Sequence, residues 1–163
     1  LLGLLRDEVG LEALAAAVSR PLAGLAVAPY YGCTLLRPRS VGIDDPDAPE
    51  VMEGVIAALG GAPVPFAERA ECCGAYLTAV GPEVVAGRVG RILASARASG
   101  AELVVTSCPL CHYNLAEHRP AEVPETPLVY LGELLAHALV ADWPVPEPLR
   151  ASTSKRADTG VPS

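Results

Sequence analysis

The strongest constraint on the fold is a set of short apolar runs, three of which end a few residues before cysteine. Apolar runs of about four to eight residues between turn signals predict buried strands. The runs are Leu25–Ala28, Val64–Ala67 and Leu103–Thr106, with Leu128–Tyr130 as a fourth candidate strand. The cysteines that follow the first three runs are Cys33, Cys72, Cys73, Cys108 and Cys111.

Segments with helical periodicity alternate with these runs. Helices are predicted over Leu1–Ser19, Glu50–Leu59, Pro82–Gly100, from Cys108 onward and over Gly132–Ala141. The alternation predicts an α/β fold with a small, mostly parallel sheet of about four strands flanked by helices. Because the carboxyl ends of parallel strands share one edge of a sheet, where ligand sites collect, all five thiols are expected to meet there.

Length and composition predict one packed domain followed by a tail. A chain of 163 residues matches a single domain of about 100–200 residues, and its 51% apolar content supplies a core. We place this domain over residues 1–143 and predict a disordered tail over residues 144–163, which are rich in Pro, Ser, Lys, Asp and Gly. The chain begins inside an amphipathic pattern without a methionine, so we expect it to be the C-terminal piece of a longer polypeptide.

Charge and hydropathy argue against two classes of partner. The net charge of −7 argues against nucleic acid, whose phosphates require clustered Lys and Arg. No stretch reaches the ~18 consecutive apolar residues of a membrane-spanning helix, so no transmembrane segment is expected. Charged residues at positions 6–8 interrupt the N-terminal leucines, unlike a signal peptide. We therefore expect a cytoplasmic protein.

The cysteine pattern favours a metal site over disulfides. Five cysteines are an odd number at low density, which does not suit a disulfide scaffold. Cys108-x-x-Cys111 alone is compatible with a redox dithiol, half a zinc site or half a cluster site. The adjacent thiolates of Cys72 and Cys73 repel each other unless a metal neutralises them. At the start of a predicted helix, the Cys108–Cys111 turn also offers free N–H groups to thiolates.

Three motifs make the chain resemble a known family, the cysteine-rich CCG domain found in the B subunit of heterodisulfide reductase. The motifs are Tyr30-Tyr31-Gly32-Cys33 followed by Arg37-Pro38, then Cys72-Cys73-Gly74, then Cys108-Pro109-Leu110-Cys111 with Asn114-Leu115. The resemblance covers roughly Leu1–Ala141 and is strongest to the second, C-terminal, of the two CCG domains in that protein. The upstream CCG domain that the family normally carries is absent from this chain.

The resemblance implies a cofactor, a reaction and partners. Each complete CCG motif of this family holds a noncubane [4Fe-4S] cluster on all five cysteines, which here are Cys33, Cys72, Cys73, Cys108 and Cys111. The chain would then be an iron–sulfur subunit of an oxidoreductase that reduces a small disulfide to thiols. Its implied partners are ferredoxin-like iron–sulfur and flavoprotein subunits, through which it could be membrane-associated. The sequence does not identify the disulfide.

Two other functions remain open. Related CCG domains occur in succinate–quinone and in glycolate or lactate oxidising complexes, where the cluster would relay electrons without touching a disulfide. A structural zinc site on four of the thiolates would instead make the chain an interaction domain, with one cysteine left over.

The residues around the cysteines have mainly structural interpretations. Tyr30 and Tyr31 are predicted to pack at the end of a strand, and the acidic loop that begins at Asp44 is predicted to be a solvated turn. Arg37 is interpreted as a salt-bridged loop residue, with neutralisation of cluster charge as the alternative. His112 is interpreted as a neutral core or surface residue, with a hydrogen-bond donor or proton source beside the cluster as the alternative.

Overall fold

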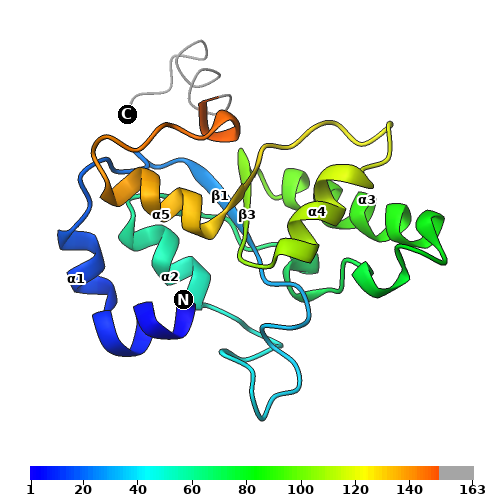
Figure 1. The fold of residues 1–163 in the computed structure, drawn as a ribbon, viewed down its shortest axis with the longest axis horizontal. Coiled ribbons are helices and arrows are strands. Elements are labelled where there is room, and N and C mark those ends of the chain that lie inside the picture. Colours follow the sequence, from blue (N-terminus) through cyan, green and yellow to red (C-terminus); the bar gives the residue numbers. More distant parts are fainter. Residues whose placement is uncertain (151–163) are drawn as a thin grey trace.

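A sheet of four parallel strands, in the order β2-β1-β3-β4, forms the centre of the molecule (Figure 1). The strands are β1 Ala26–Tyr30, β2 Ala62–Pro63, β3 Leu103–Thr106 and β4 Leu128–Tyr130. The structure is a computed structural model and describes residues 1–150. It confirms the α/β fold with a mostly parallel sheet, and β3 and β4 have their predicted bounds.

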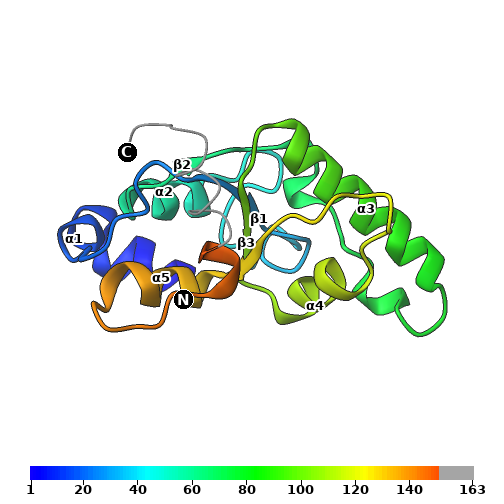
Figure 2. The ribbon, with the colours of Figure 1, turned by 90° about the horizontal axis from the view of Figure 1, so that it is seen from above.

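Helices cover both faces of the sheet (Figures 1 and 2). One face carries α1 Leu11–Ala16, α2 Val51–Ala58 and α5 Leu131–Leu139, and the other carries α3 Pro82–Ala98 and α4 Pro109–Glu117. Strand side chains alternate between the two faces. Val27 and Val105 therefore join the first core, whereas Ala28 and Val104 join the second. Burial on both faces explains why the strands appear as continuous apolar runs.

The second strand differs from its prediction. It was expected at Val64–Ala67, but β2 is Ala62–Pro63, and a 3-10 turn, η2, follows at Ala67–Ala70. The N–H groups on either side of Pro63 donate to β1 at 2.8 and 2.9 Å. Proline has no N–H to donate, and β2 tolerates it because β2 is an edge strand. With Pro63 and Pro65 so close together, little further pairing can form.

The first helix also differs from its prediction, because Gly10 interrupts it. The expected single helix over Leu1–Ser19 is instead a π-helical segment, η1 Leu4–Val9, followed by α1. Gly10 lies between them with φ of 81°, in the left-handed region that glycine adopts without a Cβ penalty. The apolar periodicity continues across the break, so the pattern alone does not reveal it.

The segment after Trp143 is only partly described. Of the predicted disordered tail over 144–163, residues 151–163 lie outside the described residues. In the described part, a helical turn at 147–150 places Leu149 in the first core with 1% of its surface exposed. Burial of this leucine opposes the disordering effect of the neighbouring prolines. Among the described residues, no helix combines the length and apolar character needed to cross a membrane.

Candidate metal centre

The cysteines lie at the edge of the sheet where the strands end. Tyr30, Thr106 and Tyr130 are in register at the ends of β1, β3 and β4, so these strands stop level with one another. After β1 the chain continues to α2 on one face, and after β3 it enters α4 on the other. Chains that diverge in this way leave a crevice between the two strand ends, the usual ligand site of an open α/β sheet.

The thiols at this edge form two close pairs. The Sγ atoms of Cys33 and Cys72 are 3.5 Å apart, and those of Cys73 and Cys111 are 3.6 Å apart. Two sulfurs bound to one tetrahedral metal at about 2.3 Å would be roughly 3.8 Å apart, so each pair has nearly the spacing of a bound pair. Within residues 1–150, no three His, Cys, Asp or Glu side chains converge on a single ion. The donors are therefore arranged as pairs.

Cys108 and Cys111 are positioned by the start of α4. Cys108 is the N-cap residue and Pro109 occupies the first turn, so the helix begins where the Cys-x-x-Cys motif predicts. The N–H of Cys108 donates to Thr106 Oγ1 at 3.4 Å, which fixes the motif to the end of β3. The N-terminal dipole of a helix favours negative charge, so this position stabilises thiolates.

Two glycines allow the backbone to pass close to the sulfurs. Gly32 has φ of 66°, and a Cβ at this position would lie 2.9 Å from the Sγ of Cys111. Gly74 has φ of 83°, and its N–H donates to the Sγ of Cys72 at 3.3 Å. The glycines that precede Cys33 and follow Cys73 are thus part of the site itself.

The thiols differ in acidity because their hydrogen bonds differ. The contact with the Cys111 thiol, together with N–H donors from Ala75 and Asn114, lowers the pKa of Cys73 to about 6 despite its burial. The same contact and burial raise the pKa of Cys111. Burial also raises the pKa of Cys72. Without metal, negative charge is therefore concentrated on Cys73, and metal binding at neutral pH would release protons from its neighbours.

Tyr30 lies beneath the thiols. It is fully buried, and its hydroxyl donates to the carbonyl of Glu71 at 2.8 Å, next to the cysteine pair. Burial raises the pKa of Tyr30, and the charges of four nearby cysteines raise it further; these are Cys111, Cys73, Cys72 and Cys33. Tyr30 thus excludes water from the inner side of both thiol pairs. The predicted packing role of Tyr30 and Tyr31 is confirmed, since both are fully buried.

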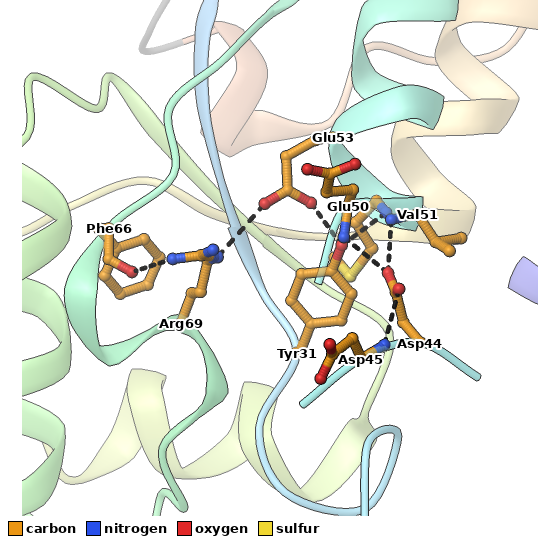
Figure 3. A network of polar contacts seen from close by, with 9 residues as sticks. Tyr31, Asp44, Asp45, Glu50, Val51, Glu53, Phe66 and Arg69 are labelled. Atoms are coloured by element: carbon orange, nitrogen blue, oxygen red, sulfur yellow. Dashed lines mark hydrogen bonds and ion pairs between the residues drawn. The ribbon is translucent and has the colours of Figure 1, made fainter. Parts of the chain in front are cut away.

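Tyr31 belongs to a polar network on the other face of β1 (Figure 3). Its hydroxyl donates to the Glu53 carboxylate and accepts the N–H of Met52 at 2.8 Å. Glu53 also forms an ion pair with Arg69, with 3.4 Å between Oε1 and Nε. The Arg69 carbonyl accepts the N–H of Tyr31 at 2.8 Å. The network therefore ties the end of β1, helix α2 and the segment before Cys72 together.

The acidic loop contributes a helix cap, which its interpretation as a solvated turn misses. Asp44 Oδ2 accepts the N–H groups of Glu50 and Val51 at 2.6 and 2.7 Å, at the start of α2 (Figure 3). Asp45 and Asp47 pair with the exposed Arg39, as expected of a surface turn. No sequence signal separates Asp44 from its neighbours, because it reaches six residues ahead rather than the usual two or three of an N-cap.

Tyr31→Phe is expected to destabilise the protein by about 1–3 kcal/mol, because a buried N–H and a buried carboxylate lose a partner. The measurement is the free energy of unfolding by urea. Tyr113→Phe is the matched control, since the Tyr113 side chain is mostly exposed. It should change the free energy of unfolding by less than about 0.5 kcal/mol. Equal values for the two variants would contradict a structural role of the network.

His112 and Arg37 make contacts that the sequence does not predict. The His112 ring stacks on Tyr130 with 4.1 Å between ring centroids, and burial lowers the pKa of His112. These observations agree with a neutral imidazole. Arg37 donates to the carbonyl of Ala70 at 3.0 Å, instead of forming the expected salt bridge. It thereby links the loop after Cys33 to the turn before Cys72.

Comparisons with known proteins agree with this arrangement. The family model described as "CCG: Cysteine-rich domain" matches residues 27–116. The chain is 34% identical over 135 residues to the 8-methylmenaquinol:fumarate reductase membrane anchor subunit of Wolinella succinogenes, covering 78% of this chain and 48% of that protein. It is 31% identical over 116 residues to the B subunit of the ferredoxin/F(420)H(2)-dependent CoB-CoM heterodisulfide reductase of Methanosarcina acetivorans, covering 66% and 37%.

A third relative, from Archaeoglobus profundus, is a protein like the B subunit of heterodisulfide reductase and is 33% identical over 112 residues. The chain spans less than half the length of these curated relatives. The first two names describe subunits of oxidoreductases. The family match covers more than half of the chain and includes all five cysteines. The chain therefore belongs to the CCG cysteine-rich domain family.

Proposed function

We propose that the chain binds a noncubane [4Fe-4S] cluster through five cysteine ligands and acts as an iron–sulfur subunit of a heterodisulfide reductase-type oxidoreductase. The proposed ligands are Cys33, Cys72, Cys73, Cys108 and Cys111. The observation that carries the proposal is the arrangement of four thiols as two metal-spaced pairs at one edge of the sheet. The fifth, Cys108, lies close enough to Cys111 to affect its acidity.

The donor set fits an iron–sulfur cluster better than a single zinc ion. Structural zinc is held by four ligands that converge tetrahedrally, whereas these thiols are paired and number five. Thiolates are the usual ligands of iron–sulfur clusters, and a cluster with several irons can use separate pairs. The Gly32 backbone also leaves no room for a Cβ beside Cys111, which suits a bulky group held close to the chain.

The exposure of the ligands supports a redox role over a purely structural one. Cys73 and Cys111 are buried, whereas Cys33, Cys72 and Cys108 are partly exposed. A substrate sulfur or a redox partner would therefore approach from the side of the partly exposed thiols. When bound, the cluster would supply single electrons, two of which cleave a disulfide to two thiols with uptake of two protons. Tyr30 and the buried thiols would exclude water from the opposite side.

An electron-relay function is the second candidate. It is supported by the similarity to the 8-methylmenaquinol:fumarate reductase anchor protein, which is higher in identity and in coverage than the similarity to the Methanosarcina heterodisulfide reductase. In this case the chain would pass electrons between a quinol-linked partner and a flavoprotein without binding a disulfide. In either case we propose cytoplasmic exposure of the domain, with any membrane association made through partners.

We also propose that the chain acts together with a second CCG domain, which would supply another cluster. The basis is its coverage of less than half of each relative. Ferredoxin-like iron–sulfur and flavoprotein subunits would complete the complex. Disulfide reduction by the full complex would favour the first function over the relay, and quinol-dependent turnover without disulfide reduction would favour the relay.

The cofactor is tested by measuring iron, acid-labile sulfide and zinc per chain after anaerobic purification. We expect about four iron and about four sulfide per chain with little zinc, as the [4Fe-4S] composition requires. About one zinc per chain without sulfide would contradict the cluster and indicate the structural domain instead.

A further inference from the structure

Asn114 is the only side chain of its chemical kind in this protein. The sequence contains one asparagine and no glutamine, so it has a single carboxamide side chain. Asn114 lies in α4, one turn beyond Cys111, and only 1% of its surface is exposed. A buried carboxamide is costly unless its donors and acceptor find partners. Its partners therefore indicate why an amide is present at this position.

The amide of Asn114 is directed at Cys73. Its Nδ2 lies 3.7 Å from the Cys73 Sγ and 3.4 Å from the Cys73 carbonyl oxygen. On the other side, its Oδ1 lies 3.3 Å from Thr78 Oγ1, which also contacts the Ala75 carbonyl at 2.9 Å. One side chain thus connects α4, the CCG turn and the turn η3 (Ala75–Leu77) that follows it.

The contacts determine which way the amide points. In the opposite orientation, Oδ1 would face the Cys73 carbonyl oxygen, and neither atom can donate a hydrogen bond. In the observed orientation, both acceptors on Cys73 face the NH₂ group. The Asn114 amide is therefore held as an N–H donor toward the sulfur that carries most of the thiolate character in the site.

We propose that Asn114 is a positioning residue that sets the reduction potential of the cluster by donating a hydrogen bond to the Cys73 sulfur. This inference rests on the proposed cluster. Hydrogen bonds to ligand sulfurs favour the more negatively charged, reduced state and so raise the reduction potential. Thr78 supports the effect, because its hydroxyl holds the Oδ1 side of the amide.

The test is a reduction-potential titration of the cluster, monitored by electron paramagnetic resonance, in Asn114→Leu and Asn114→Asp. Leucine removes the donor at similar volume, and aspartate replaces it with an acceptor. We expect both variants to retain iron and to shift the reduced-to-oxidised ratio about tenfold toward the oxidised state at fixed potential. For a one-electron couple this is a decrease of about 59 mV in the reduction potential.

Two threonines provide a matched pair of variants. Thr78→Val should lower the potential by less than Asn114→Leu, because the amide keeps its contact with Cys73. Thr126→Val should leave the potential unchanged, because this buried threonine precedes β4 at the opposite end of the strand from the cysteines. An equal shift in both threonine variants would overturn the proposal, since loss of any buried hydroxyl would then suffice.

A second measurement uses the metal-free protein and does not depend on the variants. The Asn114 side-chain amide gives the only carboxamide NH₂ signal in an ¹⁵N–¹H spectrum. We expect these protons to exchange slowly with solvent, as hydrogen-bonded, buried donors do. Fast exchange, or an unchanged potential in an iron-loaded Asn114 variant, would overturn the proposal. A wild-type chain without iron and sulfide would instead contradict the proposed function, so the two failures are distinguishable.

Discussion

Cys73→Ser is expected to lose most of the bound iron. Serine keeps the shape of the side chain but offers a hard, weakly acidic oxygen where a cluster needs a soft thiolate. Changes that affect only the neighbours of ligands cost metal affinity roughly 10–100-fold, so the loss of a central ligand should cost more. Cys73 is also the buried member of the Cys-Cys pair, so no other group can take its place. The measurement is iron and sulfide per chain after anaerobic purification.

Two further variants define the controls for this prediction. Cys108→Ser should also lose most of its iron, because Cys108 is a proposed ligand on a different segment. His112→Gln should keep its iron and change at most the rate or the potential, because His112 stacks on Tyr130 and is not a proposed ligand. A full, unaltered cluster in Cys73→Ser would contradict the assignment of five ligands.

Gly32→Ala is expected to impair both stability and iron binding. An L-residue in the left-handed region costs about 1–2 kcal/mol. The new methyl group would also lie 2.9 Å from the Sγ of Cys111. The backbone cannot easily yield, because the N–H groups of Tyr31 and Gly32 both donate to the Arg69 carbonyl, at 2.8 and 3.2 Å. The thiol must therefore move, which separates it from Cys73.

Gly24→Ala is the matched control for this variant. Gly24 has φ of 69°, nearly the same as Gly32, but a Cβ there would meet nothing within 4 Å. The control should show only the backbone strain, or a decrease in Tm of about 2–4 °C for each kcal/mol in a chain of this size. It should keep its iron. Equal iron contents in the two variants would show that the space beside Cys111 does not matter for the cluster.

Local signals in the sequence were sufficient for most of the fold. Leu103–Thr106 and Leu128–Tyr130 were predicted with their observed bounds because short apolar runs between turn residues leave few alternatives. Pro82 and the Cys108-Pro109 step mark helix starts, since proline favours the first turn. Where the prediction failed, at β2 and at Gly10, a local apolar pattern continued across a backbone feature that it does not encode.

The five cysteines and the order of strands and helices were readable from the sequence alone. The pairing of Cys33 with Cys72 and of Cys73 with Cys111 was not, because it depends on which strands are neighbours and where their ends lie. The same holds for Asn114 beside Cys73 and for the network of Tyr31, Glu53 and Arg69. These contacts join segments distant in sequence, and spacing along the chain carries no information about such distances. The sequence determined which donors are present, and the packing of helices on the sheet decided which of them meet.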